Sequence, residues 1–470
     1  MYRKLLFVVA LFAGEHSAFA QTMVSSDALM PMKPFETGER VAFVGNSITE
    51  AGYYESYVWL YYMLHYPGRR ITVYNCGIGG DRAKNMLYRL DDDVLAKKPT
   101  TICLTFGMND SGYYEFLSSN ADSTAKERVR ESRLFFDTIE QKLKAYTPAK
   151  KVLITSSLYD ETVKNPKNYF PKKSLAMDEI SAFQQSAARA NHWGMVDFFH
   201  PMTAITLREQ KRDSTFTLTG PDRIHPGNAG HFVMAYLFLK AQGLAGKPVA
   251  EIVIDAAGKK IGKAVNCQLS GLTVVPGEVK VDYLAGSLPF PQDSIPRLRD
   301  NPQRQTGALD VVPFNEEMNR EMLTVGGLAA GEYTLTIDQV QVGKWTGDQL
   351  SGGINLALVK NTPEYEQAMA VLWLNEERME LESKLRAYYW LQFNFFRDNG
   401  LYFSDNGAAM DSLNVTAEKN WFVASKKDNY RAARYAAVRR SWQKEMDVLV
   451  NEIYLVNQPR KHTIRIKKVS

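Results

Sequence analysis

From about residue 40, short apolar runs alternate with longer segments whose apolar residues recur every three or four positions. The apolar runs lie at Val41–Val44, Ile71–Asn75, Thr101–Phe106, Lys151–Ser156 and Met195–Phe198. The segments with helical spacing lie at Tyr53–Tyr66, Ala83–Ala96, Ser123–Tyr146, Met177–His192 and Ala229–Gln242. Strands that alternate with helices predict an α/β domain over residues 38–245, in which a parallel sheet carries helices on both faces.

After about residue 246 the pattern changes to an alternation of apolar and polar residues, which is typical of strands with one buried face. The alternating runs are Glu251–Asp255, Val279–Tyr283 and Glu332–Val342, and turn signals separate them. This pattern predicts an antiparallel β domain over residues 250–360. Residues 289–318, rich in proline, asparagine and charge, are expected to form a long loop.

Residues 361–456 return to helical spacing. The pair Thr362–Pro363 followed by acidic residues is a good helix start, and a later helix is expected over Tyr435–Ile453. Strand-like alternation then reappears at Thr463–Ile466. We expect this last strand, within residues 460–470, to pair back into the β domain, so that the helices form an insertion within it.

The N-terminus has the features of a signal peptide over residues 1–20. Arg3 and Lys4 precede an apolar run, Leu5–Ala13, and Ala18–Ala20 offers a cleavage site of small residues. The run is too short to span a bilayer, which takes about 20 residues. The chain is therefore expected to be exported, secreted or periplasmic, without an integral membrane span.

The composition is that of a globular protein, with 45% hydrophobic and 23% charged residues. A net charge of +5 over 470 residues is too small to favour nucleic acid as a partner, and no dense basic stripe carries interleaved aromatics. Three cysteines are too few for a disulfide scaffold, although a Cys76–Cys103 bridge stays open. Without a CxxC or HExxH motif, we expect no metal or other cofactor.

Polar residues that can carry chemistry follow the predicted strands where these end. The first strand ends in VAFVGNSITE, which places Ser47 directly after the turn at Gly45. Later strands are followed by Asn75–Asp81, Gly107–Asp110 and Asp222–His225. Because the carboxyl ends of parallel strands meet at one edge of a sheet, where ligands bind, these segments are expected to lie together.

These residue types suit nucleophilic hydrolysis. The hydroxyl of Ser47 becomes a good nucleophile when a base takes its proton, and His225 can be that base. Asp222, three residues before the histidine, can fix the histidine tautomer and stabilise its protonated form. The N–H groups of Ser47 and Gly80 and the amide of Asn109 can form an oxyanion hole for the tetrahedral intermediate.

The ordered segments resemble the four motif blocks of the SGNH (GDSL-type) hydrolases. The matching blocks are Gly45–Ile48, the loop at Gly80, Gly107–Asp110 and Asp222–His225, spread over roughly residues 38–245. This resemblance implies a flavodoxin-like sheet and metal-free hydrolysis of ester or thioester bonds. It also implies that the serine is the nucleophile, with the histidine, aspartate, glycine and asparagine in the roles given above.

One residue departs from the family pattern, because Asn46 stands where an aspartate is usual. The neutral amide can still form local hydrogen bonds, so we expect activity. The sequence is also similar to an exported, carbohydrate-associated subgroup with a C-terminal extension, which Gly353–Ala357 matches more loosely.

Each candidate has an ordinary structural alternative. Ser47 can be a helix N-cap, Asn109 a turn residue bonded to backbone, and Asp222–His225 a surface loop. The four blocks together favour the catalytic roles. The other histidines that compete for the role of base are expected to be structural or solvated: His65, His192, His200 and His231.

Two segments of the helical region have both a structural and a functional interpretation. The basic run Lys426–Lys444 fits the solvated face of the predicted Tyr435–Ile453 helix better than an anionic-glycan site. The aromatic cluster Tyr388–Phe403 fits a core, although a sugar-stacking platform or a lid over the active site is the alternative.

The sequence thus predicts an exported serine esterase that acts on acylated carbohydrate, most simply on acetyl esters, or on another small ester. A second hypothesis is a catalytically weak or inactive glycan-binding or scaffold protein on a hydrolase fold. A third is a lipolytic esterase. No residue of the sequence fixes the acyl group or the alcohol moiety.

Overall fold

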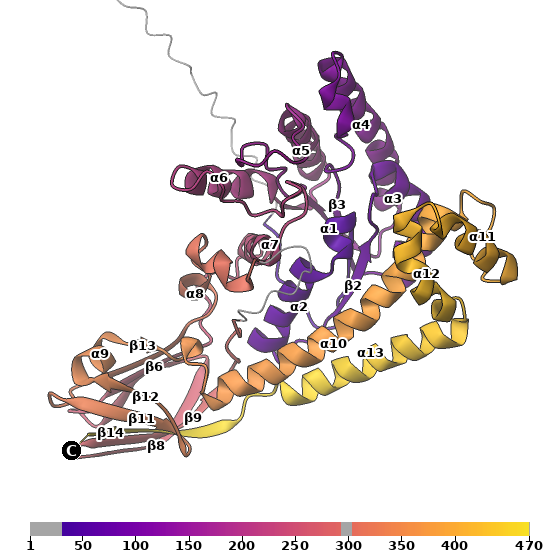
Figure 1. The fold of residues 1–470 in the computed structure, drawn as a ribbon. Coiled ribbons are helices and arrows are strands. Elements are labelled where there is room, and N and C mark those ends of the chain that lie inside the picture. Colours follow the sequence, from indigo (N-terminus) through magenta and orange to yellow (C-terminus); the bar gives the residue numbers. More distant parts are fainter. Residues whose placement is uncertain (1–30, 293–302, 470) are drawn as a thin grey trace, which may run out of the picture.

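The computed structural model describes residues 31–292 and 303–469, so the predicted signal peptide lies outside the described residues. An α/β domain, a β domain and a long pair of helices follow one another along the chain (Figure 1). Within the described ranges, no helix has the length and apolar character needed to cross a membrane.

The α/β domain is built on a five-stranded parallel sheet in the order β2-β1-β3-β4-β5. Its strands are β1 (Arg40–Gly45), β2 (Thr72–Gly77), β3 (Thr101–Thr105), β4 (Lys150–Ile154) and β5 (Gly194–Val196). Its helices are α1 (Ser47–Glu50), α2 (Tyr53–His65), α3 (Ala83–Arg89), α4 (Ala121–Ala145), α5 (Lys173–Ala190), α6 (Phe199–Gln210) and α7 (Asn228–Ala241).

Both faces of this sheet are buried, which explains why its strands are almost continuously apolar. Val41 and Phe43 of β1 pack into a core with α2 and α7. Ala42 and Val44 pack on the other face with α3 and α4. The predicted fold class, a parallel sheet with helices on both faces, is confirmed.

Two helices differ from the prediction. α3 ends at Arg89, not at Ala96, because the chain tightens into a π-helical turn at Leu90–Val94 and a 3-10 turn at Leu95–Lys97. The sequence pattern did not predict α6, whose first turn contains Pro201. Proline is tolerated there because the first N–H groups of a helix have no partner within the helix.

The two strand cysteines do not form the bridge that the sequence left open. Cys76 in β2 and Cys103 in β3 flank β1 and pack into the cores on opposite faces of the sheet. Both are free, buried thiols, and Cys267 is also free.

The β domain contains two packed sheets, ordered β13-β10-β6-β7 and β12-β11-β14-β9-β8. Its strands are β6 (Ala250–Asp255), β7 (Lys260–Val265), β8 (Cys267–Val275), β9 (Glu278–Ala285), β10 (Glu321–Gly326), β11 (Glu332–Ile337), β12 (Val340–Thr346), β13 (Ile354–Asn355) and β14 (Lys461–Lys468). The pairing is antiparallel as expected, except that β6 and β10 run parallel.

Two segments of this domain differ from the sequence pattern. The alternating run Glu332–Val342 is not one strand but the hairpin of β11 and β12, which turns at Asp338 with a left-handed φ of 54°. The expected loop at 289–318 includes a 3-10 turn, Gln305–Asp310, and the short helix α8 (Phe314–Glu317), while residues 293–302 lie outside the described residues.

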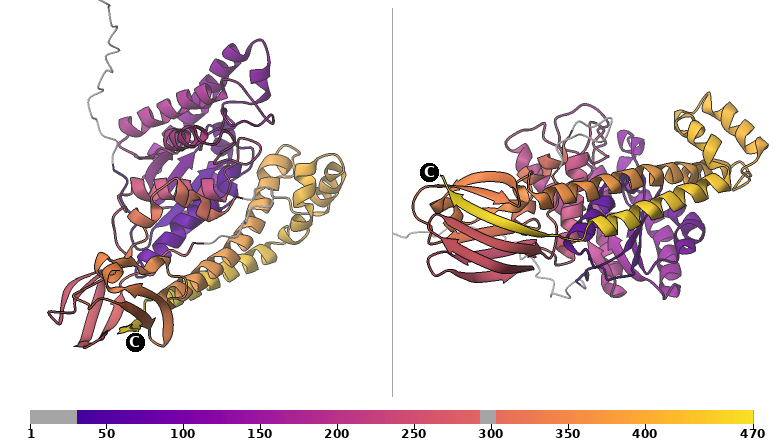
Figure 2. Two further views of the ribbon diagram at one scale, coloured as in Figure 1. Left: turned by 60° about the vertical axis from the view of Figure 1, so that its left-hand side comes forward. Right: turned by 90° about the horizontal axis from the view of Figure 1, so that it is seen from below.

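Four helices separate β13 from β14, and a short helix, α9 (Gly347–Gly352), precedes β13. The four helices are α10 (Pro363–Leu391), α11 (Gly407–Ala417), α12 (Trp421–Ala433) and α13 (Ala436–Val456). α10 and α13 run side by side from the β domain, and α11 and α12 form the far end (Figures 1 and 2). β14 then lies between β9 and β11, so the helices are an insertion within the β domain.

The first turn of α10 buries a carboxyl group against the β domain. Glu364 is 1% exposed, and neither of its oxygens has a hydrogen-bond partner within the described residues. Burial raises its pKa, and the nearby carboxyl of Glu321 adds to this while His462 opposes it. Burial also raises the pKa of Glu321, which accepts a hydrogen bond from the Tyr283 hydroxyl at 2.7 Å.

We expect Glu364→Gln to stabilise the protein, relative to the wild type, more at pH 8 than at pH 5. The folded-state pKa lies above the unfolded value of about 4.3, so the free energy of unfolding falls as the pH rises past that value. The neutral amide removes this loss, and each kcal/mol recovered raises Tm by about 2–4 °C.

Thermal melts of the variant and the wild type at pH 5 and pH 8 measure this difference. The matched control is Glu366→Gln, an exposed residue of the same helical turn, whose Tm difference from the wild type should not change with pH. A Glu364→Gln difference that is equal at both pH values would contradict the prediction.

Candidate active site

Ser47 is the first residue of α1 and follows β1 through a tight turn. The side-chain oxygen of Asn46 accepts a hydrogen bond from the Ile48 N–H at 3.0 Å, so Asn46 is the N-cap of this helix. Gly45 must lack a side chain, because a Cβ there would lie 2.1 Å from Oγ1 of Thr49. The strand therefore ends with Ser47 at the cavity on the carboxyl edge of the sheet.

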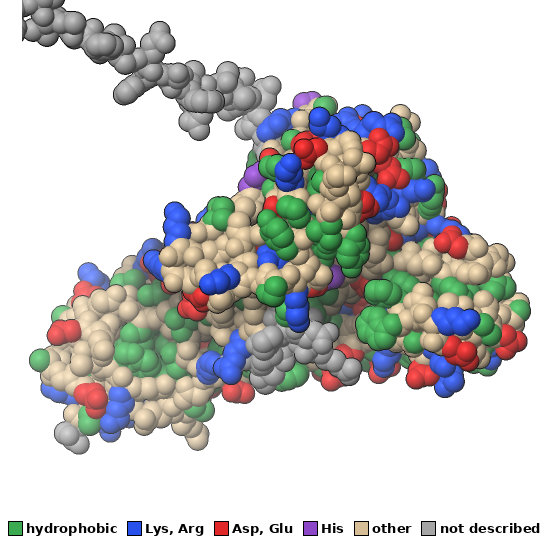
Figure 3. All heavy atoms as spheres, turned by 45° about the horizontal axis from the view of Figure 1, so that its top comes forward, with side chains coloured by type: hydrophobic (Ala, Val, Ile, Leu, Met, Phe, Trp, Pro, Cys, Tyr) green, Lys and Arg blue, Asp and Glu red, His purple; other side chains and the backbone are tan. Residues whose placement is uncertain are grey.

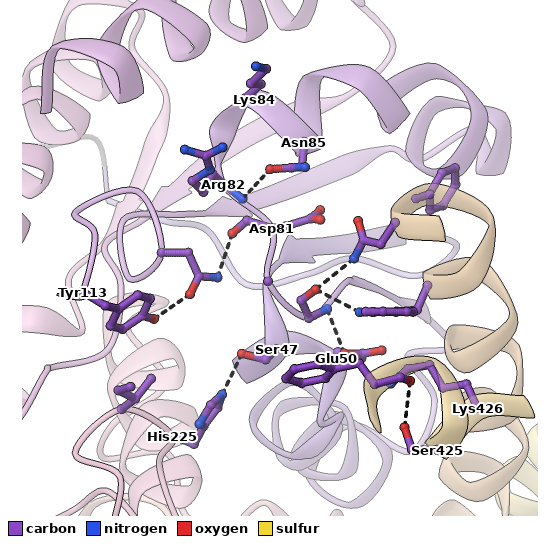
Figure 4. A pocket seen from close by; sticks show the side chains of 18 of the residues that line it. Ser47, Glu50, Asp81, Arg82, Lys84, Asn85, Tyr113, His225, Ser425 and Lys426 are labelled. Carbon is purple, nitrogen blue, oxygen red and sulfur yellow. Dashed lines mark hydrogen bonds between the residues drawn. The ribbon is translucent and has the colours of Figure 1, made fainter. Parts of the chain in front are cut away.

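Ser47, His225 and Asp222 form a continuous chain of contacts. Ser47 Oγ lies 2.8 Å from His225 Nε2, and His225 Nδ1 lies 2.5 Å from Asp222 Oδ2 (Figure 4 shows the first contact). The other oxygen of Asp222 accepts the backbone N–H groups of Ile224 and His225, both at 3.0 Å. Burial opposes the ionisation of Asp222, but the hydrogen bond and the charge of His225 outweigh it and lower the pKa of the carboxyl.

The loop that carries this histidine is held firmly to the domain. Arg223 has a left-handed φ of 65°, and its guanidinium donates to the carbonyl oxygens of Lys167 at 2.7 Å and Asp160 at 2.9 Å. Arg223 is 3% exposed, so these bonds are shielded from water. The loop is therefore an anchored part of the α/β domain.

The two further oxyanion-hole candidates line the same cavity as Ser47. Gly80 has a left-handed φ of 86°, and no atom lies within 4 Å of the position of an added Cβ. The Asn109 amide donates to the Asp81 carbonyl at 2.9 Å and accepts from the Tyr113 hydroxyl at 2.6 Å. Asn109 thus combines the contact expected of a turn residue with a place beside the serine.

The cavity has a volume of about 920 Å³ and lies between the α/β domain and the helical insertion. The insertion contributes Trp390, Phe393, Asn394, Arg397, Asp398, Trp421, Phe422, Ser425 and Lys426 to its wall. On the opposite side the wall includes the aromatic residues Tyr88, Tyr113, Tyr114 and Phe170. Hydrophobic side chains gather on both sides of the hollow between the α/β domain and the far end of the insertion (Figure 3).

The sequence predicted part of this wall, because a platform or lid over the active site was the alternative to a core for the cluster Tyr388–Phe403. In the cluster Tyr388–Phe403, Tyr388 is buried in the core of the insertion, whereas Trp390 and Phe393 line the cavity. Helical spacing was the available signal, because residues three or four apart share a face, but the sequence does not show what that face contacts.

The expectation for the basic run at 426–444 is wrong in part. The run spans two helices, α12 and α13, rather than the face of one helix. Lys426 is not on a solvated face but reaches the cavity from α12, with Nζ 4.5 Å from the ring centre of Trp390 (Figure 4). Burial lowers the pKa of Lys426, and the carboxylate of Glu50 opposes this shift.

His225 is the histidine that hydrogen-bonds to Ser47. His65 and His231 are buried, and burial lowers the pKa of each to about 3. His200 is more exposed and lies in an ion pair with Asp197. Across residues 31–292 and 303–469, no group of three or more His, Cys, Asp or Glu side chains has an arrangement that could hold a metal ion.

The solved structure of BT4096, a gut microbial diltiazem-metabolizing enzyme, matches this chain with a TM-score of 0.91. The two sequences are 42% identical over 94% of this chain and 100% of that one. The model of the GDSL-like lipase/acylhydrolase family matches residues 43–232. The chain belongs to this family. It is a carboxylic ester hydrolase of the GDSL (SGNH) type, and the resemblance found in the sequence is confirmed.

Other relatives match separate parts of this GDSL hydrolase. Residues 369–458 match the family described as the diltiazem deacetylase C-terminal helical domain. An acetylxylan esterase of Geobacillus stearothermophilus is 24% identical over 222 residues, which are 44% of this chain and 95% of the esterase. The solved structure of that esterase covers 44% of this chain and 95% of its own, with 24% identity and a TM-score of 0.35.

We expect Asn46→Ala to weaken the turn that carries Ser47, because it removes the cap that holds the Ile48 N–H. Loss of an N-cap side chain lowers the free energy of unfolding by about 1 kcal/mol. Asn46→Asp restores the family pattern and keeps an acceptor oxygen, so it should retain more stability and more esterase activity than the alanine variant. Urea denaturation and esterase assays of both variants test this order, and an alanine variant equal to the wild type would contradict it.

Proposed function

We propose that this hydrolase is an exported serine esterase that removes acetyl groups from carbohydrate through Ser47, His225 and Asp222. The observation that carries the proposal is the chain of contacts from the hydroxyl through the imidazole to the carboxylate, at 2.8 Å and 2.5 Å. The apolar N-terminal run and its small-residue cleavage site support export.

In the proposed reaction, Ser47 Oγ attacks the ester carbonyl while His225 Nε2 takes the hydroxyl proton. The Asp222 carboxylate keeps the histidine proton on Nδ1 and stabilises the imidazolium that forms. The imidazolium then protonates the departing alcohol. A water molecule, activated by the same histidine, releases acetate from the acyl-enzyme.

The negative charge on the tetrahedral intermediate needs donors that are already in place. The N–H groups of Ser47 and Gly80 and the Asn109 amide are proposed for this role. Their common position around one cavity supports the assignment. The bond from Asn109 to the Asp81 carbonyl fixes which end of the amide carries the donors, because a carbonyl oxygen can only accept, and the amide oxygen then accepts from the Tyr113 hydroxyl.

The shape of the site supports a small acyl group on a bulky alcohol. The cavity of about 920 Å³ is far larger than an acetyl group, and its walls carry aromatic rings on which a sugar ring can stack. The acetylxylan esterase relative supports carbohydrate as the alcohol part. The 42% identical diltiazem-metabolizing enzyme favours a second candidate, acetyl esters of aromatic compounds, which suit the same walls.

We expect Ser47→Ala to lower kcat for p-nitrophenyl acetate by at least about 10³-fold, because removing a catalytic serine leaves only binding and the oxyanion hole. Asn109→Ala, which removes one oxyanion donor, should cost about 10²–10³-fold. A fluorophosphonate probe should label the wild type at Ser47 and leave Ser47→Ala unlabelled. If the wild type neither turns over short-chain esters nor reacts with the probe, the binding or scaffold alternative replaces this proposal.

We expect acetate release from acetylated xylo-oligosaccharides to exceed hydrolysis of long-chain esters. The assay compares kcat/KM for acetylated oligosaccharides, diltiazem and p-nitrophenyl esters from acetyl to palmitoyl. Preference for diltiazem over every oligosaccharide would replace carbohydrate with the aromatic class. Preference for palmitoyl esters would instead support a lipolytic esterase.

A further inference from the structure

A row of side chains on the insertion holds the end of β2 and the loop after it. Four residues spaced four apart form the row, namely Glu382, Arg386, Trp390 and Asn394. The Asn75 N–H donates to Glu382 Oε1 at 3.0 Å, and Arg386 Nε donates to the Gly77 carbonyl at 3.1 Å. Trp390 Nε1 and Asn394 Nδ2 both donate to the Gly79 carbonyl at 3.0 Å.

The spacing of this row matches the chain that it holds. Four residues of α-helix rise about 6 Å, and two residues of extended chain advance about 6.6 Å. Glu382 and Arg386 therefore meet Asn75 and Gly77 of β2 with both segments running in the same direction, and Trp390 continues the row to Gly79 in the turn after the strand. This fit makes the contacts a continuous feature of the helix–strand interface.

Buried charges fix the row in place. Arg386 is 2% exposed and makes two hydrogen bonds to Asp93, at 2.9 Å and 2.8 Å. Asp93 also binds Arg89 of α3 at 2.6 Å. Burial opposes the ionisation of Asp93, but Arg386 and Lys97 outweigh it and hold the pKa of this carboxyl well below its ordinary value.

The last contact of the row bears on the proposed oxyanion hole. The carbonyl of Gly79 and the N–H of Gly80 belong to one planar trans peptide, in which they point in opposite directions. Two donors that fix the carbonyl therefore also fix the direction of the Gly80 N–H. On the other side of the residue, the Gly79 N–H donates to Glu50 Oε2 at 2.8 Å.

The space around Gly79 is also closed. A Cβ on this glycine would lie 2.6 Å from Glu50 Oε2, 3.4 Å from Trp390 Nε1 and 3.7 Å from the Cβ of Ser47. Gly79 therefore lies close to both the tryptophan donor and the side chain of Ser47. A shift of this peptide would move the Gly80 N–H relative to the serine.

We propose that Trp390 and Asn394 are positioning residues that orient the Gly80 N–H for catalysis, so that the helical insertion completes the oxyanion hole of the α/β domain. This proposal rests on the oxyanion role of Gly80 given above. The insertion then acts on the transition state, in addition to forming a wall of the substrate cavity.

The test compares Trp390→Phe, Asn394→Leu and the double variant on p-nitrophenyl acetate. Trp390→Phe keeps an aromatic ring and removes only the N–H donor. Loss of an interaction that acts in the transition state lowers kcat and kcat/KM together. We expect kcat to fall about 5–10-fold for each single variant. For the double variant we expect a fall of about 10²-fold, which is close to the loss of one whole oxyanion donor. KM should change less than twofold in all three.

Trp442→Phe on α13 is the matched control, because this half-buried tryptophan packs inside the insertion. Its kcat should stay within twofold of the wild type. Thermal melts report whether each variant folds, and Trp390→Phe alone carries the test if the double variant does not. The rate of fluorophosphonate labelling at Ser47 gives a second readout, which should fall in parallel with kcat because the phosphoryl oxygen occupies the same hole.

Unchanged kcat in the Trp390 and Asn394 variants would overturn the proposal, and so would a rise in KM at constant kcat, which indicates substrate binding instead. If Ser47→Ala loses labelling and turnover while the Trp390 and Asn394 variants keep full activity, this inference is refuted and the proposed function stands. Turnover that persists in Ser47→Ala would refute the proposed function, and the inference with it.

Discussion

The buried carboxylate of Asp93 is the point at which the α/β domain and the helical insertion are tied together. Arg89 reaches it from α3 and Arg386 reaches it from α10, and both guanidinium groups are almost fully buried. Arg89 also binds Asp81 at 2.6 Å and the Gly45 carbonyl at 3.1 Å. Removing one member of a buried ion pair costs about 3–5 kcal/mol, because its partner keeps a charge that is no longer compensated, and here the remaining members of the group offset part of that cost.

These ion pairs hold together the edge of the sheet that carries the candidate site, although loops form most of it. Gly45 lies two residues before Ser47, the proposed nucleophile, and Asp81 follows the glycine that is proposed to stabilise the oxyanion. Arg89 contacts the chain on both sides of the site, and Arg386 contacts it at Gly77. A shift of either domain would therefore change the geometry around Ser47.

The sequence was sufficient for the parts whose signal is local. Alternating strands and helices predicted the α/β sheet, and the serine, glycine and asparagine lie where the strands end. The Asp-x-x-His spacing placed Asp222 and His225 within reach of each other, and the structure brings both to Ser47.

The features that the sequence did not predict depend on contacts between segments that are distant in the chain. The spacing of Trp390 and Asn394 fitted an ordinary amphipathic helix, and only the packing of that helix against β2 shows that both reach Gly79. Lys426 looked like part of a solvated helix face for the same reason. The break in α3 was equally hidden, because the π-helical turn at Leu90–Val94 places Asp93 against Arg386 of the insertion as well as against its local neighbour Arg89.

The position of β14 has a consequence for the order in which the protein is made. Thr463 of β14 and Asp282 of β9 hydrogen-bond across neighbouring strands although 181 positions separate them in the chain. The whole insertion must therefore be synthesised before β14 can pair with its neighbours. Until then β9 and β11 each have an unpaired edge, which can pair with a strand of another chain. Such distant pairing slows folding, and the proposed export would favour a chain that stays unfolded until the last strand is available.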